Sequence, residues 1–138
     1  MDGITLQEVA RARAEELPAA AITHPFGPEY DVAKVLGKMF LLLTEVRGIP
    51  EVVLKAEPRD AAAMRSSHAD ITPGYHMNKR HWITLEPGGS LDEEFVRELV
   101  TDSYLLVVET LSRAQRPVDP ASFLAAETDA AGGDAPQP

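Results

Sequence analysis

The sequence contains no cysteine, which excludes disulfide bonds and thiolate metal sites. It also lacks an apolar run of about 18 residues, the length that a membrane-spanning helix requires. Its first residues show neither the cationic start nor the apolar stretch of a secretory signal. We therefore expect a soluble, cytoplasmic protein.

Positive charge is scarce as well. Lysine and arginine number 13 against 22 aspartates and glutamates, which gives a net charge of −9 and a pI of about 4.8. A protein that coats nucleic acid without sequence preference needs a positive field, so the composition argues against that class. It does not exclude one positive face on an acidic body.

The patterns that catalysis requires are missing too. The sequence has no Gly-x-Ser-x-Gly elbow and no glycine-rich phosphate loop. Its paired acids, such as Glu15-Glu16 and residues 92–94, fall at predicted helix ends and on helix faces, where the helix dipole and solvation account for them. We therefore expect a protein that is not an enzyme and holds no cofactor.

What is present fits one domain, since 44% of the 138 residues are apolar. Capping boxes at Thr5–Glu8 and Ser90–Glu93 predict two helix starts. Hydrophobic periodicity and turn residues predict helices over 5–17, 58–68 and from the second capping box to about 113, and strands over 20–23, 31–36, 39–44, 51–55 and 81–86. Gly37-Lys38 suits a type II′ hairpin turn.

The predicted element order is α-β-β-β-β-α-β-β-α, in an α+β fold with two layers. An antiparallel sheet carries the helices on one face and leaves its other face open. Residues 1–114 form the predicted domain. Residues 115–138 are acidic and rich in alanine and proline, so we expect a disordered tail or a weak helix near 121–127.

The densest chemistry lies in the segment Tyr75–Trp82. Its eight residues include two histidines, a lysine, an arginine, an asparagine, a tyrosine and the only tryptophan. Cationic groups interleaved with aromatic rings suit contacts with phosphate together with stacking on a base. This local reversal of charge is the strongest indication of a binding surface.

Three stretches of the chain, 26–40, 53–58 and 72–84, resemble the MmcQ/YjbR family, and Asp102-Ser-Tyr104 is similar to a motif in its last helix. The resemblance implies a fold like those of frataxin (CyaY-like) and secretion chaperones. It also implies a DNA-binding role with a double-wing mode of contact, and no catalytic residues.

The candidate contacts with double-stranded DNA combine the segment with one lysine of a predicted turn. They are Lys38, Tyr75, His76, Asn78, Lys79, Arg80, His81 and Trp82. Lysine and arginine would meet phosphates, while the ring-bearing residues and the asparagine would stack or read base edges. Lys34 and Lys55 extend the same predicted strip.

Each of these residues also has a purely structural interpretation. Lys79 and Arg80 can occupy a solvated turn in which Asn78 adopts a left-handed conformation. Trp82 and Tyr75 can pack in the core.

The remaining candidates have alternatives of their own. The two histidines, which form a poor metal pair, can hydrogen-bond to the backbone or to each other. The strand lysines can pair with Asp31, Glu51 and Glu57.

Two other functions remain open. The first is a chaperone-like protein-interaction domain, because an acidic domain with an open sheet suits a protein partner. The second is a small-molecule or enzymatic site at His76 and His81, which requires a concave pocket with a perturbed histidine.

Overall fold

The structure is a computed structural model that describes residues 1–75 and 77–133, with side chains as far as residue 128. Along the chain the elements are α1 (Gly3–Glu16), β1 (Ala20–Thr23), β2 (Asp31–Val35), β3 (Lys38–Val46), β4 (Ile49–Lys55), α2 (Pro58–Ser67), β5 (Ile71–Pro73), β6 (Trp82–Leu85), α3 (Glu93–Val108), the 3-10 turn η1 (Arg113–Gln115) and α4 (Phe123–Gly133). As far as α3 this is the predicted order.

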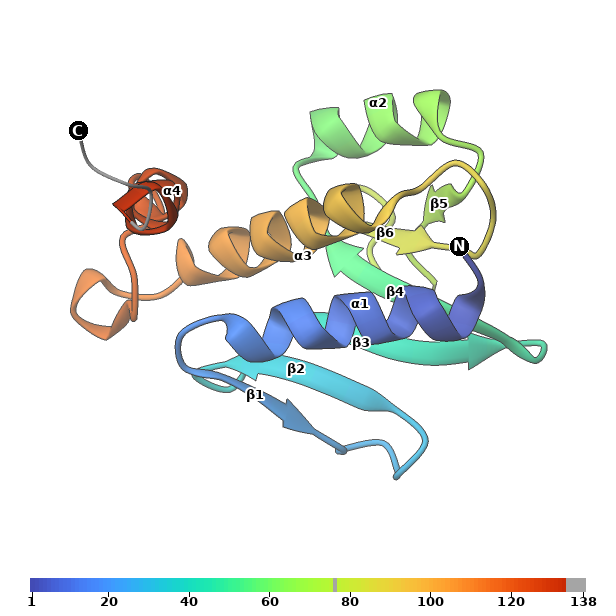
Figure 1. Cartoon of the computed structure of the whole chain (residues 1–138). Helices are drawn as coiled ribbons and strands as arrows, with labels where there is room; N and C mark the ends of the chain where they lie inside the picture. Colours follow the sequence, from blue (N-terminus) through green and yellow to red (C-terminus); the bar gives the residue numbers. More distant parts are fainter. Residues whose placement is uncertain (76, 134–138) are drawn as a thin grey trace.

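The strands form one antiparallel sheet in the order β1-β2-β3-β4-β6-β5. Helices α1 and α3 lie side by side across one face of it (Figure 1). Their apolar stripes, with Leu6, Ala10 and Tyr104 fully buried, pack on strand residues such as Leu41 and Leu54. The predicted α+β fold with two layers is confirmed.

A bulge in β3 changes which side chains face the helices. Ala33 of β2 pairs with Leu41 and the next residue pairs with Met39, so Phe40 has no partner in that ladder. As a result Phe40 and Leu41 both enter the core, and the Phe40 ring meets Tyr104 of α3 edge to face. Strand alternation alone places one of these two side chains outside.

Both tight hairpins turn on two left-handed residues. Leu36 and Gly37 have φ of 47° and 81°, and Arg47 and Gly48 have φ of 53° and 81°, as a type I′ turn requires. The predicted type II′ turn at Gly37-Lys38 is therefore wrong. The turn is of type I′ with Leu36 and Gly37 as its central residues, and Lys38 is the first residue of β3.

The helix caps also differ from the prediction. Asp2 caps α1 by accepting from the Thr5 amide, and Asp92 caps α3 by accepting from the Phe95 amide. Ser90 instead donates its hydroxyl to Asp70, 2.8 Å away, and so joins the start of α3 to the residue before β5. Ser90, which the sequence pattern predicted to cap the helix, therefore makes a tertiary hydrogen bond instead.

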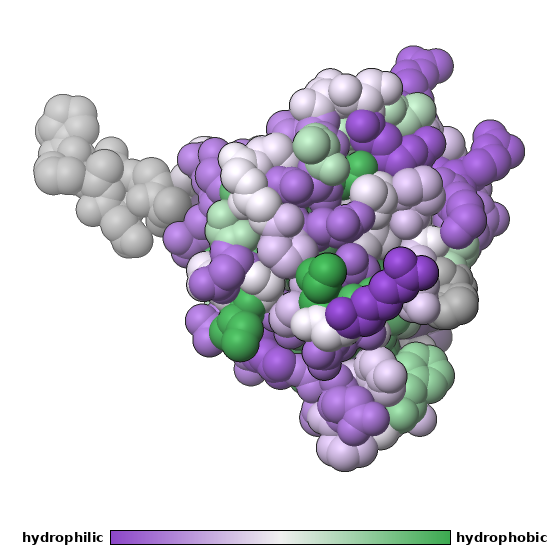
Figure 2. Space-filling view, turned by 90° about the vertical axis from the view of Figure 1, so that its right-hand side faces the viewer, coloured by the Kyte–Doolittle hydropathy of each residue, from purple (hydrophilic) through white to green (hydrophobic). Residues whose placement is uncertain are grey.

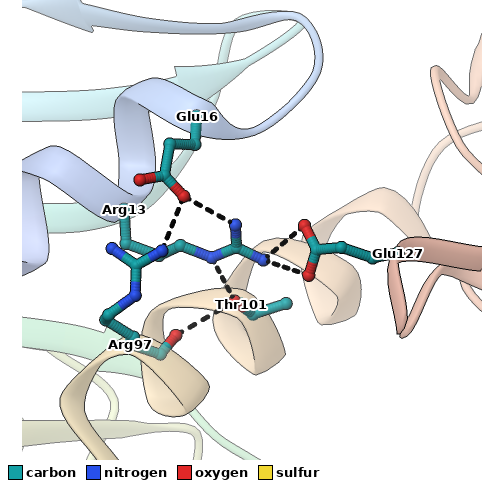
Figure 3. Close-up of polar contacts among 5 residues, drawn as sticks. All are labelled: Arg13, Glu16, Arg97, Thr101 and Glu127. Carbon is teal, nitrogen blue, oxygen red and sulfur yellow. Dashed lines mark hydrogen bonds and ion pairs between the residues drawn. The ribbon is translucent and has the colours of Figure 1, made fainter. Parts of the chain in front are cut away.

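The C-terminal stretch contains a helix where the sequence predicts a tail. Arg13 of α1 is buried, and its guanidinium bonds to Thr101 of α3 (2.8 Å), Glu16 (2.9 Å) and Glu127 of α4 (2.7 Å) (Figure 3). Burial opposes the charge, but the two carboxylates outweigh it and hold the pKa of Arg13 above its ordinary value. Helix α4 (Phe123–Gly133) overlaps the weak helix that the sequence allows near 121–127 as an alternative to disorder.

In the described part of the chain, no helix is long and apolar enough to cross a membrane. Figure 2 shows the side of the molecule that lies at the right in Figure 1, and the coloured apolar residues there are separate spots among polar ones. The coloured residues of that side form no continuous apolar surface.

Candidate functional site

The segment Tyr75–Trp82 lies in the connection between β5 and β6, and Trp82 is the first residue of β6. The amide of Trp82 donates to the Asn78 carbonyl (3.0 Å), and the Arg80 amide donates to Oδ1 of Asn78 (2.9 Å). The described residues with positive φ do not include Asn78, so the predicted left-handed conformation is wrong. Its side chain stabilises the turn by capping a backbone amide.

Gly74 lets the two arms of this connection approach closely. A Cβ on Gly74 would lie 2.6 Å from Cβ of Trp82, closer than two carbon atoms can pack. The Thr84 hydroxyl donates to the Pro73 carbonyl (3.0 Å) and accepts from the Tyr75 amide (3.0 Å). The arms are thereby held against β6, and the turn at Asn78–Arg80 forms the tip of the connection.

The Trp82 side chain lies on the sheet face opposite the helices. Ile83 and Leu85 belong to the core, so strand alternation turns Trp82 and Thr84 away from it. Trp82 pairs with Lys55 of β4 and is half-buried. It is neither a core side chain nor a fully exposed ring.

Two of the three strand lysines share this face. Lys34 and Lys55 each follow a core residue on their strands, which directs their side chains to the side of Trp82. Lys38 does not, because the bulge sets it opposite Val35, and its Nζ donates to the Thr110 hydroxyl (3.0 Å) beyond the end of α3. The structure therefore does not bring Lys38 together with the segment.

The cations of the segment are accessible. Lys79 and Arg80 are exposed, and Tyr75 is 40% exposed. Among the described residues, none of Lys34, Lys55, Lys79 and Arg80 has a carboxylate within 4.0 Å.

The predicted pairing of the strand lysines with acids is therefore not found. Asp31 pairs instead with Arg11 and with Nε2 of His24.

The same face becomes acidic at its other end, which the sequence reasoning missed. Val52 belongs to the core, so strand alternation directs its neighbours Glu51 and Val53 to the open face of the sheet. Glu86 lies beside Glu51 on that face. Burial, and then the charge of Glu86, raise the pKa of Glu51. The alternation of Glu51 with Val52 was the signal that could have shown this.

The histidines do not form a metal centre in the described part of the chain. His76 lies outside the described residues. His81 is half-buried, and its carbonyl accepts from the Ala56 amide (2.9 Å). No group of three or more His, Asp or Glu in the described ranges is placed to hold a metal ion.

Comparison with known proteins identifies the family. The profile of the YjbR family matches residues 15–106, two thirds of the chain. The chain belongs to the YjbR family. One relative is the uncharacterized protein YbdF of Escherichia coli O157:H7, which is 45% identical over 87% of this chain and 99% of its own length. Another is the uncharacterized protein YjbR of E. coli K12, which is 37% identical over 60% of this chain and 70% of its own length.

Solved structures of similar proteins agree with the fold. The crystal structure of Deinococcus radiodurans protein DR2400, a DUF419 domain, matches with a TM-score of 0.69 and 37% identity, over 77% of this chain and 81% of that one. A crystal structure of a Pseudomonas syringae protein matches with a TM-score of 0.61 and 27% identity, over 77% and 98%. Membership in the YjbR family thus gives the fold, and none of these names states a ligand.

Proposed function

We propose that the protein binds double-stranded DNA through the segment Tyr75–Trp82 and the two lysines of the same sheet face. The observation that supports this is the group of four cations without carboxylate contacts among the described residues, on a chain that is otherwise acidic. When lysine and arginine side chains contact DNA phosphates, the counterions condensed on the DNA are released, and this release is a main source of affinity for duplex DNA.

Each part of the surface has a role in this proposal. Lys79 and Arg80 at the tip of the β5–β6 connection contact phosphates, and Arg80 also reaches a base edge. Lys34 and Lys55 contact the phosphate backbone of the DNA where the duplex passes over the sheet, and Trp82 provides an apolar edge beside them. Glu51 and Glu86 repel phosphate, so the footprint ends before their end of the sheet.

In this role the protein is a binding module, not an enzyme, and acts in the cytoplasm. The segment supplies cations and rings but no activated nucleophile.

The test is fluorescence anisotropy of a labelled 20-base-pair duplex at two salt concentrations. Replacing Lys79 and Arg80 by alanine should weaken binding at least tenfold and reduce the salt slope by roughly 2, because each phosphate contact contributes about 0.9 to that slope. The matched control replaces Arg59 and Arg113, which are exposed on other elements, and removes the same charge. Equal affinity of the two double variants would refute the proposal, since net charge alone would then govern binding.

A further inference from the structure

A groove of about 520 Å³ separates α2 from α3 on the helical side of the molecule. In Figure 1, α2 stands beyond α3, away from the rest of the helical layer. Only Ala61 of α2 is buried, and the small side chain of Ala63 lines the groove without filling it. At the end of α2 the His68 ring stacks on Phe95 of α3, with 4.8 Å between centroids, and fixes the spacing of the two helices.

The floor of the groove is apolar and elongated. Phe95, Leu99 and Leu106 of α3 recur at intervals that place them on one stripe, and Met64 of α2 faces them. Three of these four side chains, all but Leu99, are only half-buried. The lining continues to Glu109, so it follows about 21 Å of α3 at 1.5 Å per residue. A long, narrow apolar floor suits an elongated occupant more than a compact one.

The groove carries acidic groups as well as apolar ones. Four carboxylates line it: Glu57, Asp60, Asp102 and Glu109, and helical spacing places Asp102 on the same stripe of α3 as Leu99 and Leu106. Within the described ranges none of them is in an ion pair. Burial, and then the charges of Glu98 and Asp60, raise the pKa of Asp102. Lys55 is the one basic residue of the lining, and strand alternation directs its side chain to the other face of the sheet.

We propose that this groove binds a basic amphipathic α-helix presented by a partner protein. The apolar stripe of such a helix would cover the half-buried floor, and its lysines and arginines would pair with the four carboxylates of the lining. A helix of about 14 residues matches the length of the lining. The proposal does not rest on DNA binding, because it uses other side chains. The Trp82 ring lies on the open face of the sheet and the groove lies on the helical side, while His81 lines a smaller pocket that shares Glu57, Leu106 and Glu109 with the groove.

The probe for the test is a fluorescein-labelled synthetic helix of about 14 residues, with leucine at helical spacing and lysine elsewhere. Two companion peptides complete the set: one has glutamate in place of every lysine, and one has the same composition in a scrambled order without a stripe. Anisotropy with the full chain should show saturable binding of the first peptide only.

Two pairs of variants locate the binding site. Asp60→Asn with Asp102→Asn should weaken binding about tenfold, the effect of removing two partly exposed charge pairs. The matched control is Glu15→Gln with Glu29→Gln, which removes the same charge from exposed positions outside the groove.

The second pair tests the groove itself. Ala63→Arg places a long cation inside the groove and should abolish binding, whereas Ala62→Arg, on the adjacent exposed residue of the same helix, should not. Far-UV circular dichroism checks that each variant is folded, and both alanines are exposed, so neither change disturbs the core.

Several results would overturn the proposal. They are equal binding by the Ala63→Arg and Ala62→Arg variants, equal losses in the two double variants, or equal affinity for the scrambled peptide. Saturable binding of phenethylamine without binding of the peptide would identify a site for small apolar amines instead.

Discussion

Replacing Ser103 by alanine should destabilise the protein by about 3 kcal/mol, because one hydroxyl joins α3 to two strands. In a regular β3–β4 ladder, the Lys55 amide would donate to the Phe40 carbonyl. Instead the Lys55 amide donates to Oγ of Ser103 (2.9 Å), and Oγ donates to the Phe40 carbonyl (2.6 Å). Ser103 is completely buried.

The magnitude follows from the two groups that lose their partner. An unsatisfied buried donor or acceptor costs about 1–3 kcal/mol, so the pair costs about 2–6 kcal/mol. For a chain of this size, 1 kcal/mol corresponds to roughly 4 °C, so the melting temperature should fall by about 10 °C. Urea unfolding gives the free energy, and exposed Ser66→Ala is the matched control.

Hydrogen exchange of the Lys55 amide separates this explanation from a simple packing defect. In the Ser103→Ala variant this amide should exchange much faster than its neighbours on β4, because it alone loses its acceptor. A loss below about 1 kcal/mol with unchanged exchange at Lys55 would refute the reasoning, since the strands would then pair directly.

Three further predictions concern buried charge and the C-terminal helix. Burial raises the pKa of Tyr104 to about 12 from 10, so the contribution of Tyr104 to stability is complete below pH 10 and is lost as the pH rises through 12, a fall of up to about 3 kcal/mol. Urea unfolding should show this slope in the parent and lose it in Tyr104→Phe. The pKa of Glu51 is also raised, so its carboxylate costs stability at pH 7; Glu51→Gln should stabilise the fold there, and the gain should disappear below about pH 4, where the group is protonated in both states. Glu127→Gln should weaken the docking of α4 by about 1 kcal/mol, measured as faster amide exchange in α4, while Thr128→Ala should not.

The sequence predicted the element order and sheet correctly because hydrophobic periodicity and turn residues determine them locally. It failed where one residue serves a distant partner. Ser90 belongs to a capping pattern but bonds to Asp70, and a bulge at Phe40, which alternation does not reveal, turns Lys38 toward the helices.

The candidate site was predictable only in part. Lys79 and Arg80 are exposed, as both the DNA-binding surface and the solvated turn require. The groove between α2 and α3 was not foreseen, because its carboxylates lie far apart in the sequence and each one resembles an ordinary solvated charge.

The motif Asp102-Ser-Tyr104 shows why a short sequence pattern need not serve one purpose. Ser103 bridges two strands, and the Tyr104 hydroxyl donates to the Pro18 carbonyl (2.7 Å), so both residues stabilise the fold. Asp102 lines the groove instead, and burial, then the charges of Glu98 and Asp60, raise the pKa of its carboxyl group. Asp102→Asn should therefore preserve or raise stability while weakening the basic peptide, whereas Ser103→Ala should lower stability and, once folded, leave peptide affinity unchanged. If both substitutions reduced stability and neither changed peptide affinity, Asp102 would be a structural residue and the acidic lining of the groove would have no role in binding.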